Sequence, residues 1–201
     1  MSVHRPSPNS GHRFFIPSDW IQDETARLHG QVVHQIAHVL RLAPGDVIAL
    51  LDNSGWEYAA RLDSIDGHSA TASILEKRLV EEPRVSLTLY QGLLKGDRFE
   101  LVLQKGTELG VSRFVPLVSR RCVASASEVR TVRWQRIIRE AAEQSGRGRL
   151  PTLSESTPFD RACREAAGLS LIPWEEAEGP GLRQALKEHG GADAVNLFIG
   201  P

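Results

Sequence analysis

The 201-residue sequence is 41% hydrophobic and 24% charged, which is ordinary for a globular protein and enough for one large or two small domains. No run approaches the roughly 20 apolar residues that span a bilayer, and the first residues lack the apolar centre of a signal peptide, so we expect a cytoplasmic protein. The two cysteines are far apart and outside any CxxC pattern, so we expect neither a disulfide framework nor a zinc site.

The chain up to about Lys77 is predicted to form a small β-barrel with one helix. Three short runs with alternating hydrophobic residues, separated by Asn-Ser-Gly and Asp-Gly turns, are VIALLD, WEYAARLDSI and SATASILEK. The helix is expected over residues 31–42, where apolar residues recur at helical spacing before Pro44-Gly45. Phe14 and Trp56 are aromatic residues of this region, and each either belongs to the core or stacks on a base.

His34, His38 and Arg41 share one side of that predicted helix. Two histidines four residues apart can hold a metal ion, but Gln35 stands where zinc hydrolases of this pattern carry a glutamate. We therefore predict no metal there.

From about Val80 to Pro83 onward, apolar strands alternate with helices, which is typical of a parallel α/β sheet. The expected strands are Val85 to Gly92, Arg113 to Val118, Gly168 to Pro173 and Ala194 to Ile199. Ligands gather at the carboxyl ends of such strands. The groups expected there are Lys95, Arg120, Arg121 and the stretch from Ile172 to Glu175.

The helix expected after Lys95 begins at Asp97, with Glu100 three residues on as in a capping box. Its core stripe comprises Phe99, Val102, Leu103, Gly106 and Leu109. A second stripe, also expected to face inward, holds Leu101, Lys105 and Glu108. A buried lysine and glutamate are costly unless they are paired or used, so these two are either a structural ion pair or site residues.

Arginines concentrate between Arg113 and Arg149, where nine arginines and three glutamates give a balance of +6, while the chain after Pro151 is net negative. Arginine matches phosphate oxygens and stacks on bases, so this segment favours an RNA-facing surface. For the helical arginines around Trp134, a solvated helix face is an equal alternative. For Arg120, Arg121, Arg147 and Arg149, at a strand end or in a glycine-rich loop, we favour ligand binding.

Three motifs between residues 95 and 151 carry a resemblance to a known family: KGDRFELVLQKGTELGV, FVPLVSRRCV and REAAEQSGRGRLP. HRFFIP, HVLRLAPGD and LLDNSGWEYAARL extend it to the N-terminal part. From about His12 to Pro201 the chain resembles the RsmE family of ribosomal RNA methyltransferases, which modify the imino nitrogen of a uridine in small-subunit RNA.

The resemblance implies an α/β protein with a PUA-like RNA-binding β-barrel over residues 1–78 and a SPOUT-type, trefoil-knot parallel α/β methyltransferase domain over residues 79–201. Family members continue past LFIGP with a glycine-rich cofactor loop and a final helix. We therefore expect the C-terminal end of the knot to be absent from this chain, and the chain to be incomplete for catalysis.

The implied cofactor is S-adenosylmethionine, held largely by backbone groups of loops after the strands. Two of these loops match Leu171, Ile172, Pro173, Trp174 and Ile199, Gly200, Pro201. A Gly-x-Gly follows a helix at Gly146 to Gly148, and no GxGxxG loop follows the first expected strand of the α/β part, which argues against an ordinary Rossmann-type methyltransferase.

The implied partner is the 16S rRNA of the small ribosomal subunit, bound by a homodimer without metal or membrane. The RNA-binding candidates are Arg13, His38, Arg41, Lys95, Arg120, Arg121 and Arg149. For His38 and Arg41, an exposed structural pair is the alternative.

Methylation at the imino nitrogen requires the uridine to lose its proton before or during attack on the sulfonium methyl, so a base or a cation is needed. Glu108 is the candidate for positioning or proton acceptance, and Lys105 and Arg147 are candidates for stabilising the anion or binding phosphate. On this hypothesis Arg147→Ala loses turnover much more than folding stability.

The alternative function is a non-catalytic RNA-binding or ribosome-assembly protein. A hydrolase using Asp97, Glu100 and Glu108 is disfavoured, because no serine or cysteine nucleophile is paired with a histidine at a recognised spacing.

Overall fold

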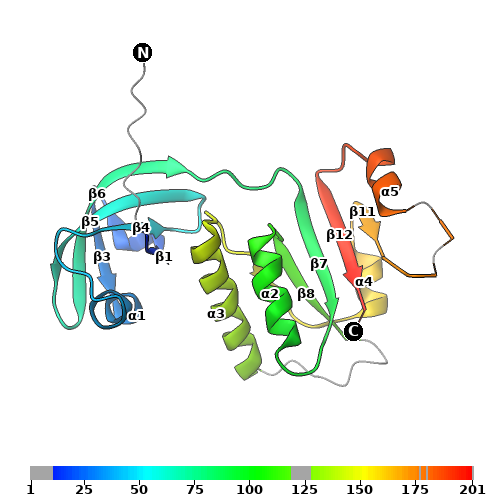
Figure 1. Ribbon diagram of the computed structural model, residues 1–201, viewed down its shortest axis with the longest axis horizontal. Coiled ribbons are helices and arrows are strands. Elements are labelled where there is room, and N and C mark those ends of the chain that lie inside the picture. The colour runs from blue at the N-terminus through cyan, green and yellow to red at the C-terminus, as the bar shows by residue number, and fades with distance from the viewer. Residues whose placement is uncertain (1–10, 119–127, 177, 180, 201) are drawn as a thin grey trace, which may run out of the picture. The chain divides into compact units, whose positions relative to one another are not determined.

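The computed structural model describes residues 11–118, 128–176, 178–179 and 181–200, and the chain divides into two compact units (Figure 1). The first unit is the chain up to Glu82 together with Gly146–Arg149. The second is Pro83–Ser145 together with the chain from Leu150 onward. The short segment Gly146–Arg149 therefore belongs structurally to the N-terminal part of the sequence.

The first unit is built on one curled six-stranded sheet in the order β1-β4-β5-β6-β3-β2. Strand β1 runs parallel to β4 and the other neighbours are antiparallel. The strands are β1 (Arg13–Phe15), β2 (Ile21–Gln22), β3 (Thr25–His29), β4 (Val47–Leu51), β5 (Trp56–Ile65) and β6 (Ser69–Leu79), and a 3-10 turn, η1, spans Ser18–Trp20. The three runs of alternating residues are strands, as predicted.

The helix of the first unit differs from the single α-helix predicted over residues 31–42. An α-helical turn, α1 (Gly30–His34), continues into a π-helical turn, η2 (Gln35–Val39), in which the Leu40 amide donates to the Gln35 carbonyl. Arg41 then takes a left-handed conformation with φ 55° and ends the helix. Val33 and Ile36 are buried in the core of the unit, and Val32 and Leu40 pack against it, as predicted. Val39, which was also predicted to face inward, is 62% exposed, because the π-helical turn shifts the helical spacing.

The second unit is a parallel sheet in the order β10-β8-β7-β12-β11, with β9 also beside β8. Its strands are β7 (Ser86–Gly92), β8 (Arg113–Val118), β9 (Thr152–Leu153), β10 (Thr157–Pro158), β11 (Leu169–Leu171) and β12 (Ala194–Ile199). The four predicted strands are all present, and the parallel α/β arrangement is confirmed.

Helices α2 (Arg98–Glu108) and α3 (Glu128–Ser145) pack together with strands β7 and β8 around Phe99, Leu103, Phe114 and Trp134. A separate cluster on Tyr90, Val115, Leu117 and Phe198 includes Ala162 of α4 (Phe159–Glu165). The last helix, α5 (Leu182–Glu188), precedes β12. Figure 1 shows β7 and β12 running side by side in the same direction.

Three expectations about α2 were wrong. Leu109 is 83% exposed instead of facing the core, and the stripe of Leu101, Lys105 and Glu108 lies at the surface. Asp97 takes the N-cap position but makes no side-chain capping bond. Only the Phe99, Leu103 and Gly106 side of the helix is fully covered.

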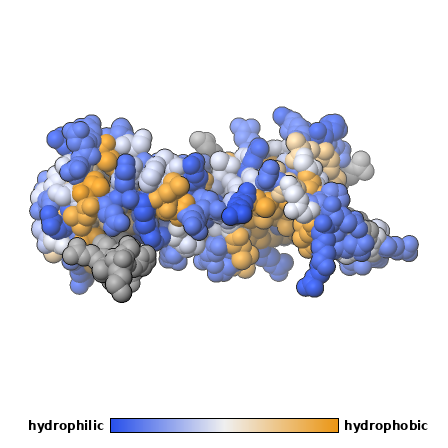
Figure 2. All heavy atoms as spheres, turned by 90° about the horizontal axis from the view of Figure 1, so that it is seen from above, coloured by the Kyte–Doolittle hydropathy of each residue, from blue (hydrophilic) through white to orange (hydrophobic). Residues whose placement is uncertain are grey.

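Hydrophilic residues predominate on the face shown in Figure 2. In the part of the chain that the structure describes, no helix combines the length and the apolar character needed to cross a membrane.

Gly106 in α2 allows the close approach of β8, and we expect Gly106→Ala to destabilise the second unit. An added Cβ would lie 2.7 Å from Cε1 of Phe114, whose side chain is fully buried. Alanine ordinarily stabilises a helix by about 1 kcal/mol over glycine, but overpacking a core costs about 1–3 kcal/mol. Chemical denaturation measures the net loss. Adding Phe114→Leu should recover part of it, and a Gly106→Ala variant more stable than the parent contradicts the prediction.

Candidate functional site

The carboxyl ends of β11 and β12 bring the two candidate cofactor loops to one edge of the parallel sheet. The strands are neighbours, with Leu171 opposite Leu197, so the segments that follow Leu171 and Ile199 both start at this edge. Ile172 and Trp174 are 58% and 60% exposed. No atom lies within 4 Å of the position that a Cβ on Gly200 would take. The edge thus carries two exposed apolar side chains; Pro201 lies outside the described residues.

Gln91, at the same edge, was missed by the sequence analysis. It is 4% exposed, and its Nε2 donates to the carbonyl oxygen of Gly200 at 3.1 Å and to that of Gly92 at 3.2 Å. The signal in the sequence was a single amide near the end of an otherwise apolar strand, RVSLTLYQGLL.

Lys105 and Glu108 form an ion pair on the surface of α2, with Nζ 3.0 and 2.9 Å from the two carboxylate oxygens. The side chains are 55% and 32% exposed. An ion pair this exposed contributes only about 0.2–1 kcal/mol to folding stability. Stability alone therefore does not explain why a lysine and a glutamate occupy these two positions. The pair is formed, and the catalytic role of either residue stays a prediction.

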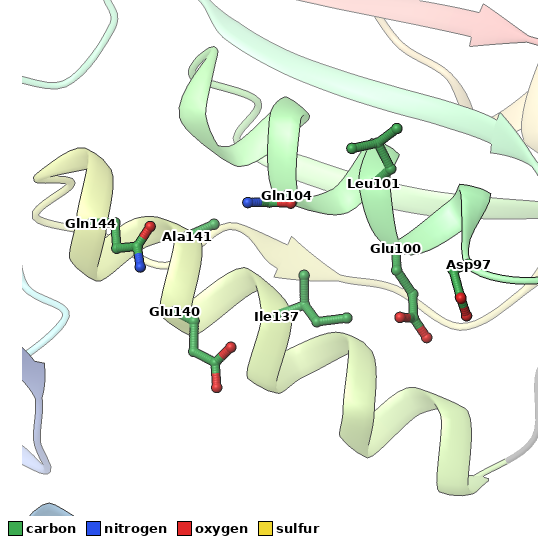
Figure 3. A pocket seen from close by; sticks show the side chains of 8 residues that line it. All are labelled: Asp97, Glu100, Leu101, Gln104, Ile137, Glu140, Ala141 and Gln144. Atoms are coloured by element: carbon green, nitrogen blue, oxygen red, sulfur yellow. The ribbon is translucent and has the colours of Figure 1, made fainter. Parts of the chain in front are cut away.

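A groove of about 380 Å³ is lined by side chains of α2 and α3 beside their packed contact, and Figure 3 shows these side chains. Its lining is Asp97, Glu100, Leu101, Gln104, Ile137, Glu140, Ala141 and Gln144. Arg133 lies 2.7 Å from Glu100 and 3.8 Å from Asp97, and Arg136 lies 3.1 Å from Glu140. These ion pairs neutralise part of the arginine-rich segment and favour the solvated helix face for Arg133 and Arg136.

The loop Gly146–Arg149 is held by the carboxylate of Glu82, within the first unit. Glu82 Oε2 accepts from Arg147 Nη2 at 2.8 Å and from Nε at 3.2 Å, and Oε1 accepts from the Gly148 and Arg149 amides at 2.9 and 3.0 Å. The Arg147 side chain is 10% exposed and that of Glu82 is 20% exposed. A Cβ on Gly148 would lie 2.8 Å from Val80, so the loop requires glycine at this position.

The other RNA-binding candidates differ in exposure. Arg13 Nη2 lies 3.2 Å from the buried carboxylate of Glu57, which Arg78 also contacts. His38, Arg41, Lys95 and Arg149 are exposed. Arg120 and Arg121 lie outside the described residues.

His38 and Arg41 occupy the most irregular backbone of the first unit. His38 lies in the π-helical turn, 5.1 Å from His34 between ring centroids, and Arg41 has a positive φ. Both features occur frequently at functional sites. Among the described residues, no group of three or more potential metal ligands is found.

The two aromatic candidates for base stacking differ in exposure. Phe14 is 3% exposed and belongs to the core, whereas Trp56 is 37% exposed. The Nζ of Lys77 lies 5.3 Å from the Trp56 ring centroid. The guanidinium of Arg149 lies against Gly55, 3.2 Å from the position that a Cβ would take there.

Family models match both units of the fold. Residues 81–201 match the RNA methyltransferase domain family, and residues 28–75 match the RNA methyltransferase PUA domain family. The chain therefore belongs to the class of proteins that combine a PUA domain with an RNA methyltransferase domain.

Individual relatives narrow the class. The ribosomal RNA small subunit methyltransferase E of Synechocystis sp. is 33% identical over 194 residues, and that of Bacillus subtilis is 30% identical over 179 residues. The chain belongs to this family, RsmE, as its motifs predicted. The matches cover 94% and 84% of this chain, but 63% and 70% of those two curated relatives.

Solved structures agree with this assignment. The ribosomal RNA small subunit methyltransferase E of Neisseria gonorrhoeae, bound to S-adenosylmethionine, superposes with a TM-score of 0.83 at 31% identity, covering 94% of this chain and 79% of that one. A putative methyltransferase of Legionella pneumophila, in complex with the same cofactor, gives 0.75 at 25% identity and covers 94% and 89%.

Proposed function

We propose that the protein transfers a methyl group from S-adenosylmethionine to the imino nitrogen, N3, of a specific uridine in the 16S rRNA of the small ribosomal subunit. The observation that carries the proposal is that β11 and β12 end side by side at one edge of the parallel sheet, next to exposed Ile172 and Trp174, in a chain of the RsmE family. A SPOUT-type trefoil knot in the α/β domain is part of the proposal, as is action in the cytoplasm.

The residues at the carboxyl edge fit the cofactor. Leu171 to Trp174 and Ile199 to Pro201 are proposed to hold it, with Ile172 and Trp174 as exposed apolar groups suited to an adenine ring and with backbone groups as hydrogen-bond partners. The cofactor supplies an electrophilic methyl group on a sulfonium sulfur.

The roles proposed on the RNA side are divided between the units. Glu108 positions the uridine or accepts its N3 proton, and Lys105 stabilises the resulting anion. Both groups are available at the surface once their mutual ion pair opens. Arg147 is the third catalytic candidate, although its bonds to Glu82 favour an anchoring role for its side chain.

Residues 1–78 are proposed to bind RNA, and residues 79–201 are proposed to bind the cofactor and catalyse methyl transfer. A paired base is out of reach of a cofactor, so the target is an unpaired or splayed nucleotide. The residues proposed to contact RNA are Arg13, His38, Arg41, Lys95, Arg120, Arg121 and Arg149. A homodimer in which one subunit presents RNA to its partner's pocket completes the proposal.

Calorimetric titration with S-adenosylmethionine tests the proposal, using this chain and a form that includes any residues the gene encodes after Pro201. We expect at least one form to bind the cofactor, and nucleoside mass spectrometry of small-subunit RNA treated with that form to show N3-methyluridine. Failure of both forms to bind contradicts the methyltransferase proposal. Retained RNA binding would then leave the non-catalytic RNA-binding protein.

Trp56 supplies a separate prediction about RNA binding. Stacking of a base on an aromatic side chain is worth about 1–3 kcal/mol, so Trp56→Ala should weaken binding of a single-stranded RNA oligonucleotide by about tenfold. Leu79→Ala is the matched control, because Leu79 is apolar, 62% exposed and opposite Trp56 in the β5–β6 ladder. Fluorescence anisotropy measures both affinities. Equal losses in the two variants would mean that apolar contact, not the ring, is responsible.

A further inference from the structure

Gln91 is a buried amide at the edge of the sheet where the cofactor loops begin. It is the last residue of β7 paired with β12, opposite Ile199, and is 4% exposed. Removing an amide from water is unfavourable unless the amide is hydrogen-bonded, and the Gln91 Nε2 donates hydrogen bonds to two carbonyl oxygens. One belongs to its own neighbour, Gly92, and the other to Gly200.

The Gly200 bond lies beyond the end of the β7–β12 ladder. The ladder pairs residues up to Ile199, so the carbonyl of Gly200 is the first of the chain to leave the sheet. Glycine at position 200 has no side chain that could fix this peptide group by packing. The 3.1 Å bond from Gln91 is therefore a direct restraint on the direction of this peptide group.

We propose that Gln91 is a positioning residue for S-adenosylmethionine. Its side-chain amide draws the Gly200 carbonyl back toward β7, which turns the Ile199–Gly200 backbone into the orientation that receives the cofactor. Gln91 acts through the loop and does not touch the reacting atoms. The inference rests on the proposed function, because it assigns this edge to the cofactor.

Preorganisation predicts a specific effect on affinity. A binding loop held in its bound conformation loses less conformational freedom when the ligand arrives, so removing the restraint weakens binding without removing any contact to the ligand. Loss of a single buried hydrogen bond of this kind corresponds to about a tenfold weaker affinity for Gln91→Leu.

Asn196 provides a matched control within the same sheet. It is a buried amide in β12, 5% exposed, and its Nδ2 donates to the Ala167 carbonyl at 2.7 Å and to Ser170 Oγ at 3.3 Å. Ala167 precedes β11 and Ser170 lies within it, so these bonds hold β11 against β12 and do not involve the Gly200 carbonyl. Asn196→Leu removes comparable buried bonds while leaving the restraint on Gly200 in place.

The experiment compares the parent protein, Gln91→Leu and Asn196→Leu by thermal unfolding without ligand and by calorimetric titration with S-adenosylmethionine and with S-adenosylhomocysteine. We expect both variants to unfold at lower temperature, but only Gln91→Leu to bind both ligands about tenfold more weakly. Gln91→Met, which keeps the length of the side chain without its amide, replaces Gln91→Leu if that variant does not fold.

Two results overturn the inference while leaving the proposed function intact: unchanged affinity in the Gln91 variants, or an equal loss in Asn196→Leu. A parent protein that binds neither ligand, either as this chain or in the form extended past Pro201, overturns the proposed function as well. Cofactor binding by the parent protein therefore distinguishes a failure of the Gln91 inference from a failure of the proposed function.

Discussion

Replacing Trp134 with alanine is expected to lower the free energy of unfolding of the second unit by about 3–5 kcal/mol, as for other large buried side chains. Trp134 is 4% exposed, and its ring centroid lies 4.5 Å from that of Phe99 with the planes inclined at 44°. The pair joins α3 to α2 above the sheet, so the truncation leaves a cavity between two helices. Urea denaturation followed by circular dichroism measures the loss.

Val132 is the control for Trp134, because it lies on the same helix and is 64% exposed. Val132→Ala should change stability by less than about 0.5 kcal/mol. Cofactor affinity, measured where Trp134→Ala remains folded, should match that of the parent, since Trp134 packs on the helical layer and not at the carboxyl edge. A similar, small effect of both substitutions would show that the α2–α3 contact contributes little.

The strands were the most predictable part of the fold. The strands Arg113–Val118 and Ala194–Ile199 have the predicted bounds. Each is a short apolar run between polar or glycine-containing segments, and a run of this length fits a buried strand better than a helix. The strand predicted over Gly168 to Pro173 is shorter, ending at Leu171. Pro173 has no backbone N–H to donate to a neighbouring strand, which limits how far β11 extends toward its C-terminal end.

The helices show where periodicity stops being informative. Leu109 has the right spacing for the core stripe of α2, but it is the C-cap residue and the chain turns at Gly110, which has a φ of 96°. The stripe through Lys105 also has helical spacing, yet the neighbouring elements cover only the side of Phe99 and Leu103. Spacing predicts which residues share a face, and tertiary packing decides how much of that face is buried.

The candidate site was predictable where it follows strand ends and unpredictable where it depends on distant partners. The cofactor loops after β11 and β12 came from strand order and family motifs. Gln91 and Gly200 are separated by 109 residues, and Glu82 and Arg147 by 65, so no local pattern pairs them. The partners of Arg133 and Arg147, Glu100 and Glu82, lie outside the arginine-rich segment, so the charge balance of that segment did not reveal these ion pairs.

Glu82→Ala is the second large effect that we expect, lowering the free energy of unfolding by about 2–4 kcal/mol. Removing one partner of a buried ion pair typically costs about 3–5 kcal/mol, and the 20% exposure of Glu82 reduces that figure. The substitution also leaves the Gly148 and Arg149 amides without their acceptor. Differential scanning calorimetry should show the loss, and Glu81→Ala, which removes an exposed neighbouring carboxylate, should show almost none.

Arg147→Ala separates anchoring from catalysis at the same loop. Glu82 keeps its two backbone donors in this variant, so the loss of stability should be smaller than in Glu82→Ala, about 1–3 kcal/mol. If Arg147 only anchors the loop, both variants should lower RNA affinity together, since each loosens the backbone that carries Arg149. A loss of turnover at saturating RNA in Arg147→Ala, with turnover retained in Glu82→Ala, would instead assign the guanidinium to the chemistry. The geometry favours the first outcome, because a guanidinium that is 10% exposed and bonded through Nε and Nη2 has little freedom to reach a substrate.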